Sequence, residues 1–363
     1  MTTNFTIPWW YNEFGEEEVQ AATEAVRGKH LSQGSITEEF EKKLGEALKV
    51  PHVVCTPSGS MALLLALMVS GVGPGDEVIV PDRTWVATAH APLLLGAKVV
   101  LVDVEPHRPI IDVSQIEKRI TKKTKAIIPV HMNGRGADIR AINEIGKKHG
   151  IHVIEDAAQA IGSRNRDGYL GTQSRMGCFS LSVAKTIATG QGGFIVTHDA
   201  ELASLLRMTR NNSVHDVKDP KKWTRPGFNF KFTDVQAAMG LVQLRKLPAR
   251  IRYLREIYQQ YTEGLAAVSE LKLIPVNLEA GEVPVYNEFL ADRRDEVMGF
   301  LAQKGIDTRL FYPNLHDATY MDQGEMKFPN ARKYGDHGVY LPSGPSQSKE
   351  NVQKVIECLL SRK

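Results

Sequence analysis

The sequence is poor in cysteine and has no large excess of charge of either sign. Its 363 residues include three cysteines, Cys55, Cys178 and Cys358, which lie far apart. Their number and spacing exclude a disulfide framework and argue against a metal site built on cysteine. The formal net charge of +3 is too small and too evenly spread to favour nucleic acid or a membrane surface. We therefore expect no metal, no nucleic acid and no membrane as partners.

Long apolar runs are missing as well. The longest, Met61 to Val69, is too short to span a bilayer. The first residues, Met-Thr-Thr-Asn-Phe-Thr-Ile-Pro, lack the basic and apolar segments of a secretory signal. No glycine-rich G-x-G-x-x-G turn occurs early in the chain, which argues against a nicotinamide dehydrogenase. The sequence predicts a cytoplasmic protein.

Short apolar runs alternate with helical patterns from Val53 onward, which predicts an α/β fold. The runs are Val78–Val80, Val99–Val102, Ala126–Val130 and His152–Ile154, and the helical patterns are Met61–Ser70, Val86–Leu95 and Ile139–His149. This alternation is typical of a mainly parallel sheet covered by helices on both faces. Two helices are expected between Gly15 and Lys49, the second of them starting with Thr37 as its cap.

A different pattern near the C-terminus predicts a smaller α+β unit. A strand is expected at Val283–Leu290, a helix near Arg294–Lys304 and a closing amphipathic helix at Asn351–Leu360. We place the boundary near residue 250, giving a large domain at 1–250, with its N-terminal helical segment, and a small domain at 251–363. The segment Asn211–Lys231 is basic, irregular and unusually long for a loop, so it is either functional or a solvated crossing.

The chemistry of the sequence centres on two strand-like runs. The first, Val153-Ile154-Glu155-Asp156, delivers a carboxylate to a sheet edge, and the second, Phe179-Ser180-Leu181, precedes Lys185. Lys185 is the only charged residue between Met176 and His198, and an isolated amine in such a stretch is costly to bury unless it is used. An acid, an amine and a hydroxyl at one rim match the needs of pyridoxal phosphate.

Many ordered motifs around these residues resemble one known family. The matching segments are Gly15-Glu16-Glu17-Glu18, Leu31-Ser32-Gln33-Gly34, Ser58-Gly59-Ser60-Met61-Ala62-Leu63, Glu155-Asp156-Ala157-Ala158-Gln159, Thr189-Gly190-Gln191-Gly192-Gly193, Gly227-Phe228-Asn229-Phe230, Thr233-Asp234-Val235-Gln236-Ala237-Ala238 and Tyr312-Pro313-Asn314-Leu315-His316. The chain resembles the DegT/DnrJ/EryC1/StrS sugar aminotransferases, which are pyridoxal-phosphate enzymes of fold type I, over nearly its whole length.

The resemblance implies a role for each residue of a cofactor site. Lys185 would bind pyridoxal 5'-phosphate covalently as an internal aldimine and then act as the catalytic base and acid. Asp156 would pair with the pyridine nitrogen, and Trp85 would stack on the ring. The remaining positions would contact the phosphate or the phenolic oxygen, and they are Gly59, Ser60, Gln159, Ser180 and Asn229. Asn229 would reach the cofactor of a neighbouring subunit, so the resemblance implies a homodimer with shared active sites.

The substrate is less constrained by the sequence. Tyr312 and His316 match the family's sugar-site motif, whereas His131 is expected to be structural. The resemblance implies transfer of an amino group, from glutamate, to a ketone on a deoxysugar that is nucleotide-linked. The lysines of the Asn211–Lys231 loop could meet its diphosphate. Departures from the family pattern at Asn133 and Gln191 leave other acceptors open, namely a keto-sugar acid or a cyclitol ketone.

Two alternatives remain at this point. The family includes a pyridoxal-dependent sugar dehydratase branch, but that branch replaces the lysine with histidine, so Lys185 argues against it. A regulatory or structural relative with a vestigial site is the other alternative. The retained acid, amine and phosphate segments argue against this alternative too.

Overall fold

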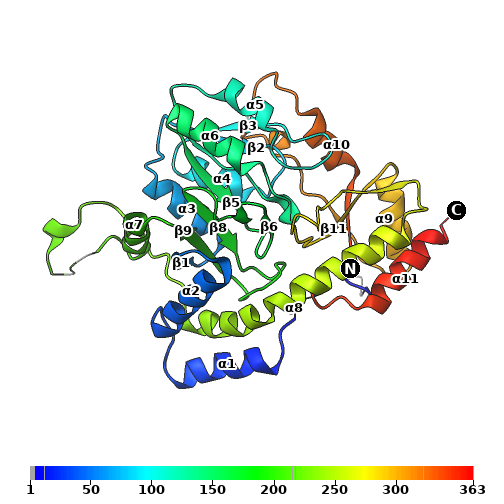
Figure 1. Ribbon diagram of the computed structural model, residues 1–363, viewed down its shortest axis with the longest axis horizontal. Coiled ribbons are helices and arrows are strands. Elements are labelled where there is room, and N and C mark those ends of the chain that lie inside the picture. The colour runs from blue at the N-terminus through cyan, green and yellow to red at the C-terminus, as the bar shows by residue number, and fades with distance from the viewer. Residues whose placement is uncertain (1–4, 12, 215, 217, 322, 363) are drawn as a thin grey trace.

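The computed structural model describes residues 5–11, 13–214, 216, 218–321 and 323–362. Within these residues the chain forms a large α/β unit followed by a smaller sheet with its own helices (Figure 1). The described strands of the large sheet lie in the order β1–β9–β8–β5–β4–β2–β3. Their bounds are β1 His52–Thr56, β2 Glu77–Pro81, β3 Lys98–Val102, β4 Thr124–Ile127, β5 His152–Asp156, β8 Met176–Ser180 and β9 Gly193–Thr197.

The sheet is mixed but mainly parallel, as expected. Strands β3, β2, β4, β5 and β8 pair in parallel, whereas β9 runs antiparallel to both β8 and β1. Parallel neighbours need crossover helices, and these cover both faces of the sheet. The helices of the large unit are α1 Glu16–Arg27, α2 Ser35–Leu48, α3 Gly59–Val69, α4 Ala87–Leu94, α5 Val113–Ile116, α6 Ile139–His149, α7 Ala200–Arg210 and α8 Asp234–Gly264.

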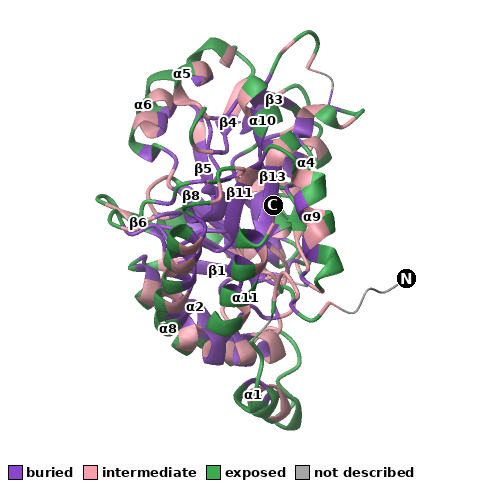
Figure 2. Cartoon of the chain, turned by 90° about the vertical axis from the view of Figure 1, so that its right-hand side faces the viewer, coloured by how far each residue is buried: buried purple, intermediate pink, exposed green. Residues whose placement is uncertain are grey.

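Alternate residues of strand β2 belong to different hydrophobic clusters, one on each face of the sheet. Val78 and Val80 of β2 pack with Leu65 of α3, whereas Ile79 between them packs with Ile142 of α6. This alternation follows from the two-residue period of a strand. Since both faces of the sheet are covered, its strands are almost wholly buried, and the exposed residues lie on the outer faces of the helices and in the loops (Figure 2).

The smaller sheet has the order β10–β11–β13–β12 among its described strands, all antiparallel. Its strands and helices are β10 Leu271–Leu273, β11 Asn287–Ala291, β12 Arg309–Leu310, β13 Gly338–Leu341, α9 Arg294–Gln303, α10 Pro329–His337 and α11 Lys349–Leu360. A short hairpin, β6 Arg164–Asn165 and β7 Gly168–Tyr169, belongs to neither sheet.

Helix α8 runs along both units (Figure 1), packing against α1 and α2 near its start and against α11 further along. The boundary predicted at residue 250 falls inside this helix, so the division into 1–250 and 251–363 stays a proposal. The N-terminal segment also crosses over, because Ile7 forms a parallel bridge with Ile306 and Trp10 forms one with Ser343.

Two local predictions were wrong. Thr37 does not cap α2, which begins at Ser35; its N–H and Oγ1 instead donate to Asp234 Oδ1, at 2.9 and 2.6 Å. A carboxylate from the distant helix α8 therefore satisfies the first turn of α2. The strand predicted at Val283–Leu290 is shortened to β11, because the N–H groups of Val283 and Tyr286 donate to side chains of the large unit rather than to a strand.

Candidate active site

A cavity of about 370 Å³ lies where β5, β8, the start of α3 and the small sheet meet. Most of the residues predicted for the cofactor site line it. These are Gly59, Ser60, Trp85, Asp156, Gln159, Ser180, Lys185 and Tyr312. The wall also contains residues that the sequence did not single out for this site, namely Thr84, Ser182, Tyr286 and Arg309.

One end of the cavity is suited to an anion. Ser58 caps α3 by accepting a hydrogen bond from Met61 N at 3.2 Å, and Gly59 and Ser60 form the first turn. The first N–H groups of a helix have no partner within it, and the helix dipole favours a negative charge there. Gly59 lies against β8: a side-chain Cβ at this position would come within 2.9 Å of the Ser180 Cβ. The backbone can therefore approach the Ser180 hydroxyl closely.

Asp156, the last residue of β5, is buried and held by two donors. Thr88 Oγ1 donates to its Oδ2 at 2.8 Å, and Ala158 N donates to its Oδ1 at 3.1 Å. Burial raises the pKa of Asp156 above its usual value, while these two hydrogen bonds and the charge of Lys185 oppose the rise. A cation that entered the cavity beside Asp156 would stabilise its ionised form. Thr88 was missed by the sequence analysis, because a threonine in the first turn of a helix gives no local signal of a partner on a distant strand.

Lys185 lies on the loop between β8 and β9 and lines the same cavity as Asp156. Burial lowers the pKa of its amine to about 8, although the charge of Asp156 acts in the opposite direction. A lysine with this pKa is partly neutral near pH 7 to 8, which makes its amine a usable nucleophile and base. Among the described residues, Lys185 forms no ion pair, although the charge of Asp156 acts on it.

Two side chains from distant segments hold the loop that carries Lys185. Tyr286 Oη donates to the carbonyl oxygen of Ala184 at 2.7 Å, and Trp10 Nε1 donates to that of Val183 at 3.0 Å. Tyr286 is fixed in turn by Asn133, whose side chain bonds the Tyr286 backbone N–H at 2.6 Å and its carbonyl oxygen at 2.8 Å. The two carbonyls before Lys185 are thus fixed from the N-terminal segment and from the segment just before β11.

Asn133 connects Tyr286 to Gln159, which also lines the cavity. Its backbone N–H donates to Gln159 Oε1 at 2.8 Å, and its backbone has a φ of 53°, a left-handed conformation that asparagine tolerates better than most residues. This explains the departure from the family pattern at Asn133 in physical terms. An amide here can accept from the backbone N–H and donate to the carbonyl oxygen of one residue, Tyr286, which an aromatic side chain could not do.

Trp85 forms the rim of the cavity. It precedes α4, is 49% exposed and meets the ring of Tyr312 edge-on at 4.9 Å between centroids. The pKa of Tyr312 is raised, mainly because its hydroxyl is buried. The contact between Trp85 and Tyr312 therefore links the large unit to the small unit at the rim of the cavity.

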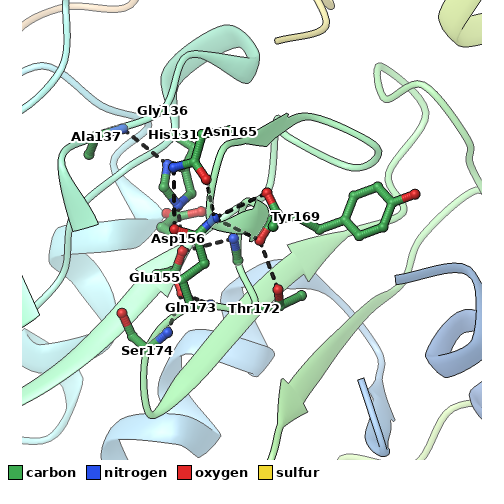
Figure 3. Close-up of polar contacts among 12 residues, drawn as sticks. His131, Gly136, Ala137, Glu155, Asp156, Asn165, Tyr169, Thr172, Gln173 and Ser174 are labelled. Carbon is green, nitrogen blue, oxygen red and sulfur yellow. Dashed lines mark hydrogen bonds and ion pairs between the residues drawn. The ribbon is translucent and has the colours of Figure 1, made fainter. Parts of the chain in front are cut away.

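Behind the cavity, Glu155 and His131 form a buried polar support (Figure 3). His131 Nδ1 accepts from Ala137 N at 3.2 Å, so its Nε2 carries the proton and donates to Glu155 Oε2 at 2.8 Å. Glu155 also accepts from three backbone N–H groups, those of Gly171, Gln173 and Ser174, at 2.7 to 2.8 Å. His131 therefore has a structural role, as expected.

Two predicted site residues do not line this cavity. Asn229 is exposed, and its Oδ1 accepts from Lys231 N at 3.3 Å. His316 is bonded to the buried Asp82 through Nδ1 at 2.6 Å and through its backbone N–H at 2.8 Å, and its ring stacks on Phe328. His316 thus ties the Tyr312 segment to the large unit.

The basic loop projects from the body beyond α7 (Figure 1). His215 and Val217 of this loop lie outside the described residues. Lys222 pairs with Asp216 and Asp219, so part of its charge is neutralised locally. None of the loop's described basic residues lines the cavity.

The residues around the cavity fit pyridoxal phosphate. A helix N-terminus and a serine hydroxyl suit the phosphate, a buried carboxylate suits a protonated ring nitrogen, and a lysine of lowered pKa suits the aldehyde. Over the described residues we find no helix long and apolar enough to cross a membrane. Those residues also contain no group of three or more metal-ligating side chains.

Comparison with known proteins identifies the family of this chain. The model of the DegT/DnrJ/EryC1/StrS aminotransferase family matches residues 12–360. A protein of Geobacillus stearothermophilus named "pleiotropic regulatory protein" is 36% identical over 356 residues, which make up 96% of this chain and 94% of that one.

Solved structures match over nearly the full length. DesV of S. venezuelae, in complex with a ketimine intermediate, has a TM-score of 0.92 and 32% identity over 97% of both chains. A DegT DnrJ EryC1 StrS aminotransferase of Brucella abortus has a TM-score of 0.88 and 30% identity over 95% of both chains. The PLP form of Spr1654 from Streptococcus pneumoniae has a TM-score of 0.91 and 26% identity over 97% of both chains. The predicted α/β fold is therefore confirmed.

Proposed function

The chain belongs to the DegT/DnrJ/EryC1/StrS aminotransferase family, and from this premise we propose a specific reaction and a role for each site residue. As a pyridoxal-phosphate-dependent sugar aminotransferase, it would take an amino group from glutamate and transfer it to the ketone of a nucleotide-linked deoxysugar. A keto-sugar acid or a cyclitol ketone is the alternative acceptor. The observation that carries the proposal is the position of Lys185 and Asp156 on one cavity beside the start of α3.

Lys185 Nζ would hold the cofactor covalently through its aldehyde carbon. When bound, the cofactor supplies an electron sink for the substrate carbon that bears nitrogen. Lys185, displaced by the substrate amine, would then remove the proton from that carbon and return it at the end of the transfer. Its lowered pKa supports this second role, because a base works best when its pKa lies near the working pH.

Asp156 would face the ring nitrogen and keep it protonated. Its hydrogen bonds from Thr88 and Ala158 fix the carboxylate in place before any ligand arrives. The N-terminus of α3, with Gly59 and Ser60, and the Ser180 hydroxyl would bind the phosphate, and Trp85 would cover the ring. Gln159, held by Asn133 N, would lie near the phenolic oxygen.

We also propose a homodimer in which Asn229 completes the partner's site. The exposure of Asn229 supports this, as do the exposed aromatic rings of Phe228 and Trp223 on the same projecting loop. Large exposed apolar side chains gathered on one segment commonly mark an interface. The vestigial alternative is not supported, because the amine, the acid and both phosphate segments meet at one cavity. The cytoplasmic location stays a prediction.

The test is a donor half-reaction. We expect the purified protein to be yellow with pyridoxal phosphate, to gain the cofactor's mass on Lys185 after borohydride reduction, and to form 2-oxoglutarate from L-glutamate. Lys185→Ala should lose the yellow absorbance, the added mass and the half-reaction together while keeping its fold. Reduction that attaches the cofactor elsewhere, or a half-reaction that survives in Lys185→Ala, would contradict the assignment.

A further inference from the structure

Arg309 is a charged residue of the cavity that the cofactor site does not use. Among the described residues of the wall, the other charged side chains are those of Lys185 and Asp156, and both are assigned to the cofactor. Arg309 lies on β12 of the small sheet, opposite Tyr340 of β13, and its side chain is exposed. A guanidinium stays protonated at any working pH. The cavity therefore retains one positive charge that no cofactor group requires.

The position of this guanidinium is set by Trp9. The Arg309 Cζ lies 4.9 Å from the centre of the Trp9 ring, at the distance of a cation–π contact. Trp9 is itself fixed, because its backbone N–H donates to Asp307 Oδ2 at 3.3 Å and its ring packs against Tyr286 and Tyr340. Stacking leaves the N–H groups at the edge of the guanidinium plane available, and these bind oxyanions in a two-pronged manner.

The carboxylates around Arg309 have other partners. Among the described residues, none forms an ion pair with it. Asp307 is near enough for Arg309 to oppose the rise in its pKa that burial causes, but its Oδ2 accepts from Trp9 N. Glu288 is buried and paired with Arg135. The neighbouring Arg83 differs, since it is buried, donates to the Tyr312 carbonyl oxygen and does not line the cavity.

We propose that Arg309, stacked on Trp9, recognises an oxyanion group of the substrate and so makes the enzyme selective for anionic substrates. The inference depends on the proposed function only in that the substrates enter this cavity. Two sources carry the required chemistry: the side-chain carboxylate of the amine donor, and a phosphate or carboxylate of the acceptor. By binding this oxyanion, Arg309 would orient either substrate so that the reacting carbon of the substrate lies beside Lys185.

The experiment compares Arg309→Gln with the wild-type holoenzyme. In the donor arm, single-turnover half-reactions use L-glutamate and L-glutamine, which have the same length but differ in side-chain charge. In the acceptor arm, calorimetry measures binding of uridine diphosphate against uridine and of D-galacturonate against D-galactose. Arg309→Lys keeps the charge without the planar fork, and Arg293→Gln removes a remote exposed arginine of the same unit as a control.

If Arg309 binds the donor, Arg309→Gln should raise the concentration of glutamate needed for half-maximal rate by about tenfold or more, since a charged hydrogen-bonded pair is lost. The maximal rate and the glutamine reaction should change by less than about threefold. If Arg309 binds the acceptor, the same loss should appear for uridine diphosphate or D-galacturonate and not for the neutral analogues. Arg309→Lys should be intermediate, and Arg293→Gln should behave as the wild type.

The proposal is overturned if Arg309→Gln affects charged and neutral probes equally, or if it affects neither. It is also overturned if the wild type shows no preference for any charged probe over its neutral analogue. A failure of the proposed function has a different signature, because the wild type would then show no yellow absorbance and no half-reaction with any amino acid. Melting curves of each variant ensure that the compared proteins are folded.

Discussion

Tyr286 Oη donates a hydrogen bond to the carbonyl oxygen of Ala184, at 2.7 Å, one residue before Lys185. The segment just before β11 therefore holds the backbone that carries the Lys185 amine, although Lys185 itself belongs to a loop of the large unit. Trp10 does the same for Val183 from the N-terminus. A lysine that binds an aldehyde and then moves a proton needs its backbone fixed, because an error of about 1 Å in position can cost two orders of magnitude in rate.

Tyr286→Phe removes this hydrogen bond, together with the contact between the Tyr286 and Tyr312 hydroxyls, and keeps the ring. We expect the half-reaction to slow by about tenfold, with a stability loss of roughly 1 to 3 kcal/mol for the unpaired carbonyl. The control is Tyr261→Phe, which removes a similar bond from Tyr261 Oη to the Pro342 carbonyl oxygen. Tyr261→Phe should lose comparable stability at an unchanged rate. Equal rates in the two variants would show that the Tyr286 bond serves only the fold.

Gly59→Ala tests the phosphate end of the cavity. The added Cβ would lie 2.9 Å from the Ser180 Cβ, so the start of α3 must move away from β8. We expect the affinity for pyridoxal phosphate to fall by at least about tenfold, as measured by equilibrium dialysis. Gly299→Ala in α9 has open space around its Cβ and should gain roughly 0.5 to 1 kcal/mol without a change in cofactor affinity. An unaltered affinity in Gly59→Ala would place the phosphate elsewhere.

Asp156→Asn retains the size of the side chain but removes its charge. We expect a folded protein whose half-reaction is slower by orders of magnitude, because the ring nitrogen loses the partner that keeps it protonated. Thr88→Val removes the donor to Oδ2, together with the contacts of the same hydroxyl to Thr84 Oγ1 and the Trp85 carbonyl oxygen. It should slow the reaction by a smaller factor, roughly tenfold. Stopped-flow absorbance measures both. Near-native turnover in Asp156→Asn would refute the role of this carboxylate.

Lys185 makes the stability of the cofactor-free protein depend on pH. Its folded pKa of about 8 lies below the value of an exposed lysine, so the unfolded chain binds more protons between these two values. Stability should therefore rise with pH above about 8. Replacing the amine by Lys185→Met should stabilise the cofactor-free protein by roughly 3 kcal/mol at pH 7, with the gain shrinking toward pH 10. Urea unfolding across this range, with Lys147→Met as an exposed control, measures the difference.

Glu155→Gln tests the support behind the cavity. One of its oxygens becomes an amino group that cannot accept, yet all four donors around the carboxylate remain. We expect a loss of roughly 2 to 4 kcal/mol in the free energy of unfolding, since buried donors are left unpaired. The exposed Glu144→Gln should change stability by less than about 0.5 kcal/mol. A full retention of stability in Glu155→Gln would mean that the cluster rearranges readily.

The positions of helices and strands could be predicted closely where they depend only on local hydrophobic periodicity. Ile139–His149 was predicted as a helix with the bounds that α6 has, and the strands β2, β3 and β5 lie where their apolar runs are. Such elements are encoded by side-chain periodicity, which is independent of the rest of the chain. The predictions that were wrong depend on long-range partners. Thr37 could not be recognised as an interior residue of α2 without knowing that Asp234 occupies its N-terminus.

The site divides in the same way. Lys185, Asp156 and Ser60 were predictable because strand ends and helix starts carry them to one rim. Tyr286 and Arg309 were not, since each reaches the cavity only through the packing of a distant segment. Thr88 was not either, because its partner Asp156 lies 68 positions further along the chain. His316 matched a motif, yet its ring is committed to Asp82.

The order of acid, hydroxyl and amine along the chain, and the alternating elements that present them, were fixed by the amino-acid sequence through local periodicity and end effects. Only the tertiary structure decided which remote side chains complete the cavity. It placed Trp9, near the N-terminus, against Arg309 of the small sheet. It also placed the Tyr286 hydroxyl against the carbonyl oxygen of Ala184, just before Lys185. The reason is physical: contacts between distant segments depend on how whole units pack, and the local sequence of one segment does not identify the segment that packs against it.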